Sequence, residues 1–178
     1  MGILKRAIKR AKRFIKDTKN FLKKEKKRVV NYAKKNHKRK KSNHQFAPGR
    51  LLTFNYDAKH KQHRYDRNPL VVALGPSRRY KGIYLGINIH WLPMNQRVLL
   101  ASLILELREK RGGDLEYEDV RPLIKKFDGS PILRSYIYNR VSNTVIDVPE
   151  EMFLKFSALS FEDIQGGDLG VSNRNKVV

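Results

Sequence analysis

The sequence contains no cysteine, which excludes structural disulfides and thiolate metal sites. It has no run of about 18 apolar residues, so no segment is predicted to span a membrane as a helix. Acidic residues are also few, since 17 Asp and Glu stand against 39 Lys and Arg in 178 residues, a formal net charge of +22. This charge predicts a polyanionic partner, either a nucleic acid or an anionic membrane surface.

The positive charge is concentrated at the N-terminus. Residues 1–41 carry 19 Lys and Arg and two acids for a net charge of +17, whereas residues 42–178 carry only +5. Changes in composition predict a basic arm (1–41), a linker (42–49), a compact domain (50–163) and a tail (164–178) that is extended or disordered.

The arm has the periodicity of an amphipathic helix. Its apolar residues alternate between spacings of three and four, which places them on one helical face. The residues expected to pack against a partner are Ile8, Ile15, Leu22 and Val29. The cations expected to contact a nucleic-acid backbone are Lys5, Arg6, Lys9, Arg10, Lys12, Arg13, Lys16, Lys19, Lys23, Lys24, Lys26, Lys27, Arg28, Lys38, Arg39, Lys40 and Lys41.

Three interpretations of this arm remain open at the level of sequence. Its cations could lie along DNA phosphates without sequence preference, with the apolar face packed on protein. Its apolar face could instead lie in a membrane interface, with lysines near the lipid headgroups. In the third interpretation the helix packs on its own domain or within an assembly and leaves a solvated basic face.

Beyond the arm, apolar patterns and turn signals predict an α+β domain with a small antiparallel sheet and three or four helices. The predicted strands are residues 50–56, 69–74, 82–92 and 145–148, with the second and third joined as a hairpin. The predicted helices are residues 95–111, 114–126 with an interruption near Pro122, 130–141 and 149–156. Asn95 is the predicted N-cap of the first of these, and Gly112-Gly113 ends it.

Side chains that could carry chemistry are sparse. The pair His60 and His63 has a spacing suited to metal, but the neighbouring lysines and Arg64 would repel a cation. Asp57 and Asp66 suggest a metal-dependent nuclease, yet both are flanked by cations, so we expect them to form local ion pairs. No phosphate-cradling or nucleophile motif occurs. The sequence predicts no enzyme, no cofactor and no metal site.

Two further features of the domain have a structural and a functional interpretation. His90 lies between apolar residues of a predicted strand, which favours a buried histidine with satisfied hydrogen bonds. The aromatic residues Tyr80, Tyr84 and Trp91 lie near the basic run RRYK at 78–81, a combination that can stack single-stranded bases. Core packing of Trp91 and an ordinary turn at the arginines is the favoured interpretation.

The segment from Phe54 to Arg97 contains NYDAKHK, RYDRNPLV and GIYLGINIHWLP in that order. This series resembles the pattern YDxK, YDRxPLV and GxxLGINxHxLP of a family of small proteins of large contractile-tailed bacteriophages, with Trp91 where the family usually has Tyr. VPEEMF at 148–153 and LSFEDIQG at 159–166 resemble the C-terminal part of that family. The resemblance implies a virion or DNA-end function and supplies no catalytic residues, and the basic arm lies outside it.

Together these features predict a non-enzymatic bacteriophage protein of the virion, or of the host cytoplasm during assembly. Its arm is expected to contact DNA backbone non-specifically while the domain docks on other virion proteins. A membrane surface and an oligomer remain open as partners. The first alternative is a structural neck, tail or baseplate component whose arm threads between subunits. The second is a membrane-active basic helix that functions in genome entry.

Overall fold

The computed structural model describes residues 2–16, 32, 46–58, 66–127 and 132–159. Residues 3–16 are helical and are called the N-terminal helix below. The helix predicted for the arm is therefore confirmed over this range. The rest of the arm except Tyr32, and the whole of the predicted tail, lie outside the described residues.

The described residues contain five strands, which form one antiparallel sheet in the order β4-β3-β2-β1-β5. The strands are β1 (Leu51–Tyr56), β2 (Leu70–Pro76), β3 (Ile83–Asn88), β4 (Leu133–Ile137) and β5 (Val141–Val148). The first three coincide with predicted strands, and β2 and β3 pair as the predicted hairpin. The third prediction is too long at its end, since β3 stops at Asn88 and the 3-10 turn η2 (Ile89–Trp91) follows. The Asn88 side chain caps this turn by accepting from the His90 backbone N–H at 3.1 Å.

The prediction of a helix over residues 130–141 is wrong. β4 occupies part of this segment and pairs with β3, with Ile137 opposite Ile83 and Leu133 opposite Ile87. β5 then begins at Val141 and includes the predicted strand 145–148. Ser130-Pro131 is a helix-start signal that depends only on neighbouring residues in the sequence. The aromatic and β-branched residues that follow form a strand instead, because they pack against cross-strand partners on β3.

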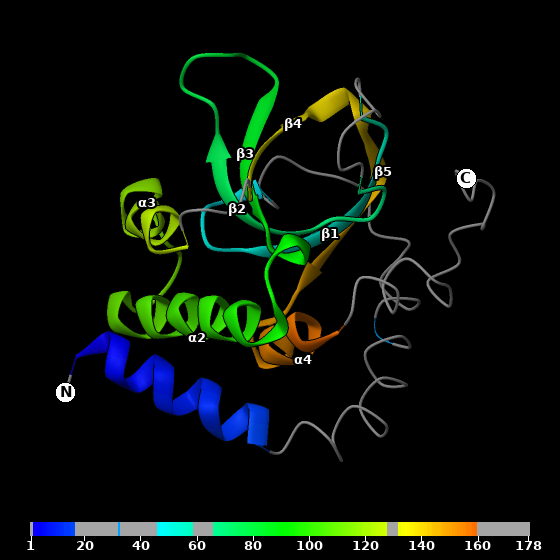
Figure 1. Cartoon of the computed structure of the whole chain (residues 1–178). Helices are drawn as coiled ribbons and strands as arrows, with labels where there is room; N and C mark the ends of the chain where they lie inside the picture. The colour runs from blue at the N-terminus through cyan, green and yellow to red at the C-terminus, as the bar shows by residue number, and fades with distance from the viewer. Residues whose placement is uncertain (1, 17–31, 33–45, 59–65, 128–131, 160–178) are drawn as a thin grey trace.

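The sheet is strongly curled. β4 and β5 lie at its two edges, although only η3 (Tyr138–Arg140) separates them in sequence. A three-residue connection can join the two edges only where they approach one another (Figure 1). Backbone hydrogen bonds from Tyr138 N to Gly82 O (2.9 Å) and from Asp57 N to Arg140 O (3.0 Å) hold η3 beside β3 and β1.

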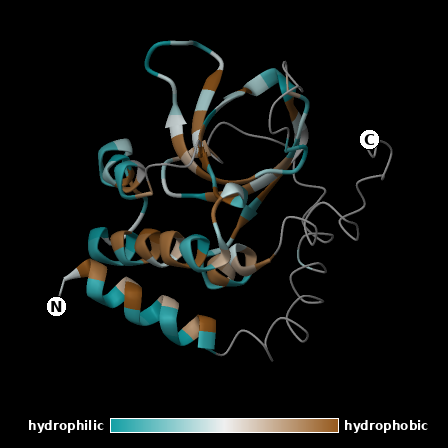
Figure 2. Cartoon of the chain, in the orientation of Figure 1, coloured by the Kyte–Doolittle hydropathy of each residue, from teal (hydrophilic) through white to brown (hydrophobic). Residues whose placement is uncertain are grey.

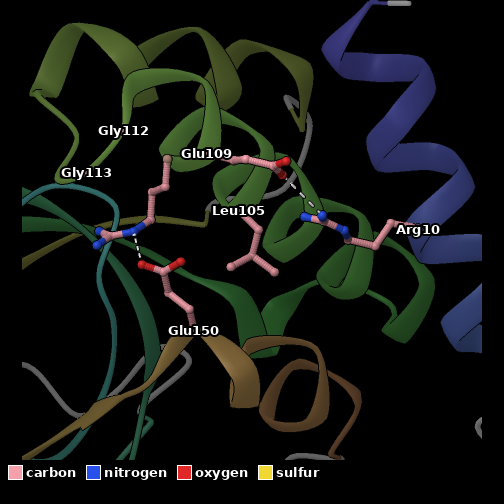
Figure 3. Close-up of a pocket in the computed structure, with 7 residues that line it drawn as sticks. Arg10, Leu105, Glu109, Gly112, Gly113 and Glu150 are labelled. Atoms are coloured by element: carbon pink, nitrogen blue, oxygen red, sulfur yellow. Dashed lines mark hydrogen bonds and ion pairs between the residues drawn. The ribbon is translucent and has the colours of Figure 1, made fainter.

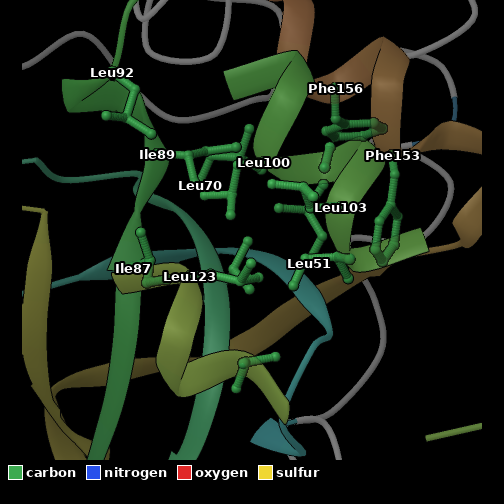
Figure 4. Packing of buried hydrophobic residues seen from close by; sticks show 14 of the residues in the cluster. Leu51, Leu70, Ile87, Ile89, Leu92, Leu100, Leu103, Leu123, Phe153 and Phe156 are labelled. Atoms are coloured by element: carbon green, nitrogen blue, oxygen red, sulfur yellow. The ribbon is translucent and has the colours of Figure 1, made fainter. Parts of the chain in front are cut away.

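Alternate strand residues are buried on opposite faces of this sheet, which therefore has two apolar layers. On one face, Leu52 and Phe54 of β1 pack with Val71 of β2 and with Tyr136. The other face is covered by helices and forms the larger core (Figure 4). Burial on both faces explains the uninterrupted apolar run PLVVAL at 69–74.

The helices of the domain are α2 (Met94–Arg111), α3 (Tyr117–Lys126) and α4 (Phe153–Ala158), with the 3-10 turn η4 (Glu150–Met152) before α4. Figure 2 shows the hydrophobic middle of α2, which lies under the sheet. Gly112 ends α2 in the left-handed conformation (φ 77°), as predicted, but the N-cap is Pro93 and not Asn95. The predicted interruption at Pro122 is also wrong, because α3 continues through it.

Phe46 is a core residue within the segment predicted as a linker. Its side chain is 3% exposed, and its ring centroid lies 4.5 Å from that of Tyr84 and 5.9 Å from that of Phe54. The sequence analysis did not identify Phe46 as a core residue, because the residues around it are polar or typical of turns. The folded core therefore includes Phe46, five residues before β1 begins at Leu51.

Candidate nucleic-acid interface

The N-terminal helix packs lengthwise and antiparallel against α2 (Figure 1). Its contact line is built on two small residues one helical turn apart, Ala7 and Ala11, which are 0% and 4% exposed. Ala11 packs with Val98 of α2 and Ala158 of α4, and Ala7 belongs to the large core. Small side chains allow two helix backbones to approach closely, so this helix is part of the folded domain.

Two arginines strengthen this packing by binding a buried carboxylate. Glu106 of α2 is 3% exposed, and its carboxylate lies 2.8 Å from Arg6 Nε and 3.2 Å from Arg10 Nη1. Arg10 also pairs with Glu109 at 3.3 Å. A buried carboxylate is stable only when its charge is compensated. Glu106 therefore favours the packing of the basic helix against α2.

A hollow of about 470 Å³ lies between Arg10, the C-terminal end of α2 and Glu150 (Figure 3). The Arg10–Glu109 pair borders it on one side, and Arg108 pairs with Glu150 at 2.6 Å on the other. These cations are engaged by carboxylates of the same molecule. The ion pairs at the rim of the hollow therefore link the N-terminal helix to α2, and α2 to η4.

The remaining cations of the N-terminal helix form an exposed stripe. Lys5, Lys9, Lys12 and Lys16 follow one another at spacings of four, three and four, and all are exposed. At 100° per residue this stripe lies opposite the buried line of Ala7 and Ala11. Arg13 is exposed beside it, and no ion pair joins any of these five cations to another described residue.

A shallow groove of about 530 Å³ runs beside this stripe. It is lined by four cations of the helix together with Phe14, Glu106 and Leu154. The four cations are Arg6, Lys9, Arg10 and Arg13. The groove lies where the helix meets α2 and α4, and it adjoins the exposed lysine stripe through Lys9.

Two of the four residues predicted to pack against a partner, Ile8 and Ile15, lie in this helix. Ile8 and Ile15 are half-buried, and Ile15 packs against the cluster of Ala11 and Val98. Ala7, which the prediction omitted, is fully buried, whereas Leu4 is 39% exposed. The alanine pair at i,i+4 was the signal that could have identified the interface. Leu22, Val29 and the predicted cations from Lys19 to Lys41 lie outside the described residues.

Tyr32 is a second point at which the arm contacts the domain. Its hydroxyl donates to the backbone carbonyl of Asp147 at 3.1 Å. Its ring meets that of Phe156 edge to face, with centroids 6.2 Å apart. The arm therefore contacts the domain both at its first helix and at residue 32.

Polar residues of two sequence motifs converge in the interior. Asp66 of RYDRNPLV accepts hydrogen bonds from Asn88 Nδ2 (2.9 Å) and Asn68 N (3.1 Å), and its Oδ2 lies 2.8 Å from His90 Nδ1. The side chains of Asp66 and His90 are 3% and 0% exposed. Burial raises the pKa of the Tyr136 phenol well above its ordinary value, and the negative charge of Asp66 raises it further.

This network bears on two predictions. Asp66 forms interior hydrogen bonds with Asn88 and His90, while its expected pairing with the flanking cations stays a prediction, because Arg64 lies outside the described residues. The prediction of a buried, hydrogen-bonded His90 is confirmed. Asp57, in contrast, is exposed and pairs with Arg140 at 3.5 Å. His60 and His63 lie outside the described residues, and the described ones contain no group of three or more His, Asp or Glu that could hold a metal ion.

The predicted cluster of aromatic and basic residues is divided in the structure. Tyr84 packs with Phe46 and Tyr138, and Trp91 is half-buried against the large core. Tyr80 alone projects from the β2–β3 connection, where it is 53% exposed. In the described part of the chain, no helix has the length and apolar character needed to cross a membrane.

A family model described as phage T4 terminal DNA protecting protein matches residues 4–159. The chain belongs to this family. Membership makes it a bacteriophage protein associated with DNA, in agreement with the phage family and DNA-end function that the motif resemblance implies. The family match begins inside the N-terminal helix, which corrects the expectation that the basic arm lies outside the family pattern. Comparisons with curated proteins and with solved structures gave no match.

Proposed function

We propose that this protein binds DNA through the exposed basic stripe of its N-terminal helix, without sequence preference and without catalysis. The observation that carries the proposal is the division of the helix cations into two sets. Arg6 and Arg10 are engaged by Glu106, whereas Lys5, Lys9, Lys12, Arg13 and Lys16 are exposed and form no ion pair with another described residue. Cations on a rigid helix backed by protein are suited to lie along a phosphate backbone.

The packing of the helix supports this interpretation over the two alternatives for the arm. Ala7, Ala11 and Phe14 contact the domain, so most of the apolar face of residues 3–16 is used within the chain. A helix that threads between subunits, or one that lies in a lipid interface, requires that face for its partner. The basic stripe remains the surface that this helix offers to another molecule.

A non-catalytic role is supported by how the buried acidic groups are used. Asp66 is an acceptor for Asn88, Asn68 and His90, and Glu106 is compensated by two arginines. Both carboxylates thus stabilise the fold. We propose that the protein acts by occupying DNA at its termini, in the virion or in the host cytoplasm during assembly, while its domain docks on other virion proteins.

The test is the salt dependence of binding to a duplex of arbitrary sequence. Replacement of Lys9, Lys12 and Lys16 by Gln should weaken binding to all duplexes alike. The slope of log affinity against log salt should fall by roughly 0.9 for each lysine that contacts a phosphate. The affinity is measured by fluorescence anisotropy over a salt series with the full chain.

The matched control replaces Lys110, Lys125 and Lys126 by Gln. These lysines are exposed on α2 and α3, and their replacement removes the same net charge. The control should keep the salt slope of the unchanged protein. Equal loss in both triple variants would show that net charge and not the helix surface governs binding, and the proposal would then fail.

A further inference from the structure

The tip of the β2–β3 hairpin, residues 77–82, is an exposed surface that combines one aromatic ring with three cations. Tyr80 is 53% exposed, and among the described residues the other large hydrophobic side chains with high exposure are the aliphatic Leu4 and Leu133. Arg78, Arg79 and Lys81 are all exposed beside it. An exposed aromatic ring beside cations is the combination with which proteins stack bases and hold the adjacent phosphates.

The tip is held in a defined shape. The Ser77 hydroxyl accepts from the backbone N–H groups of Arg79 (3.3 Å) and Tyr80 (3.2 Å). Ser77 N donates to Ile83 O at 2.8 Å, and Gly82 takes the positive φ of 75° that closes the turn. A preformed tip presents its ring at low cost in conformational entropy.

The surroundings of Tyr80 suit a nucleobase. The guanidinium of Arg79 lies over the ring, 5.3 Å from its centroid, and the side chain keeps its high exposure despite this contact. Arg78 is 82% exposed and its contact with Glu118, at 3.4 Å, is a weak surface pair that a phosphate can replace. Together these residues provide a stacking surface with adjacent phosphate-binding groups.

We propose that this hairpin tip recognises a DNA end, with Tyr80 stacked on the terminal base and Arg78, Arg79 and Lys81 on the adjacent phosphates. The base pairs inside a duplex are stacked on both sides and offer no free π-face, whereas the last base pair offers one. The inference rests on the proposed association with DNA, and it adds the feature that distinguishes an end from the interior of a duplex.

The hairpin tip and the N-terminal helix lie at opposite ends of the molecule (Figure 1). The two surfaces therefore contact different stretches of DNA, and each can be altered without touching the other. The helix supplies affinity for any backbone, and the tip supplies preference for ends.

The test uses the full chain and a short blunt duplex that carries 2-aminopurine either at the terminal position or near the middle of one strand. Binding should change the fluorescence of the terminal probe and leave that of the internal probe unaltered. Tyr80→Ala should abolish the terminal change and weaken binding to ends by about tenfold, the size of one base–aromatic stack. Tyr80→Phe keeps the ring and should retain both properties.

Two controls separate this inference from the proposed function. The triple replacement of Lys9, Lys12 and Lys16 should lower affinity in a salt-dependent way and leave the terminal signal intact at saturating protein. Leu133→Ala, at another exposed hydrophobic, should change neither property. If Tyr80→Ala retains the terminal signal and the affinity, the tip does not bind DNA ends, and an acidic protein surface becomes its better partner. If the unchanged protein binds neither duplex, the proposed function fails as well.

Discussion

At the scale of single residues, Asp66 is the acceptor at which three parts of the domain meet. It receives hydrogen bonds from Asn68 on its own loop and from Asn88 at the end of β3, and it lies beside His90 in η2. The 2.8 Å between Asp66 Oδ2 and His90 Nδ1 is a hydrogen-bonding distance between two buried side chains. Polar residues of two separate sequence motifs thus form one buried hydrogen-bond network, which joins the loop before β2 to the end of β3.

Replacement of Asp66 by Ala leaves buried donors on Asn88 and His90 without their acceptor. We expect the free energy of unfolding to fall by about 2–5 kcal/mol, measured by urea denaturation. The matched control is Asp57→Ala, since Asp57 is 61% exposed and its pair with Arg140 lies at the surface. Its loss should stay below about 1 kcal/mol. Equal losses in the two variants would contradict the role assigned to Asp66.

At the scale of secondary-structure elements, β2 and β3 approach so closely that one position admits no side chain. Gly86 of β3 lies opposite Ala73 in the pairing. A Cβ at this position would overlap Val71 Cγ1 and lie 3.3 Å from the carbonyl oxygen of Val72. Val71 is 3% exposed, so its side chain is itself packed within the core. The second glycine of GIYLG is therefore a packing requirement of the hairpin.

Gly86→Ala should accordingly destabilise the protein by about 1–3 kcal/mol through overpacking, visible as a lower urea midpoint at unchanged slope. Gly113→Ala serves as the control because a Cβ there meets no atom within 4 Å and the residue is exposed. Its effect should lie within about 0.5 kcal/mol. A neutral Gly86→Ala would mean that β2 and β3 are farther apart than the structure places them.

At the scale of the whole molecule, the basic arm is not an independent appendage over residues 3–16. Ala7 and Ala11 are buried against α2 and α4, and Glu106 depends on two arginines of the helix for its charge balance. Removal of the arm would therefore uncover apolar surface and a buried carboxylate together. Substitutions of exposed lysines test DNA binding more cleanly than a truncation does.

Ala7→Leu inserts a larger side chain into this fully buried contact. We expect it to lower the free energy of unfolding of the whole molecule by about 1–3 kcal/mol in a single cooperative transition. Leu4→Ala, at a residue 39% exposed on the same helix, should change stability by less than about 0.5 kcal/mol. An unfolding midpoint that Ala7→Leu leaves unchanged would show that the helix is detached in solution.

The local sequence pattern was sufficient to predict elements that are marked by regular apolar periodicity and by turn residues. The hairpin of β2 and β3, the termination of α2 at Gly112 and the helical character of residues 3–16 all follow from periodicity and turn residues. The segment 130–141 failed because its cap signal is local, whereas the partner of β4 is a strand about fifty residues earlier in the chain. Ala7 was missed because a small residue carries little weight in a hydrophobic pattern.

The sequence by itself shows that the positive charge is concentrated in residues 1–41, and it predicts a helix there and a polyanionic partner, because charge and periodicity are properties of consecutive residues. Which cations remain available was decided by the tertiary structure alone, since Glu106 lies about a hundred residues from Arg6 and Arg10. The same holds for Tyr80, which only the folded hairpin separates from Tyr84 and Trp91. Ion pairing and exposure depend on neighbours in space, and those neighbours are set by the packing of the helix and the curl of the sheet.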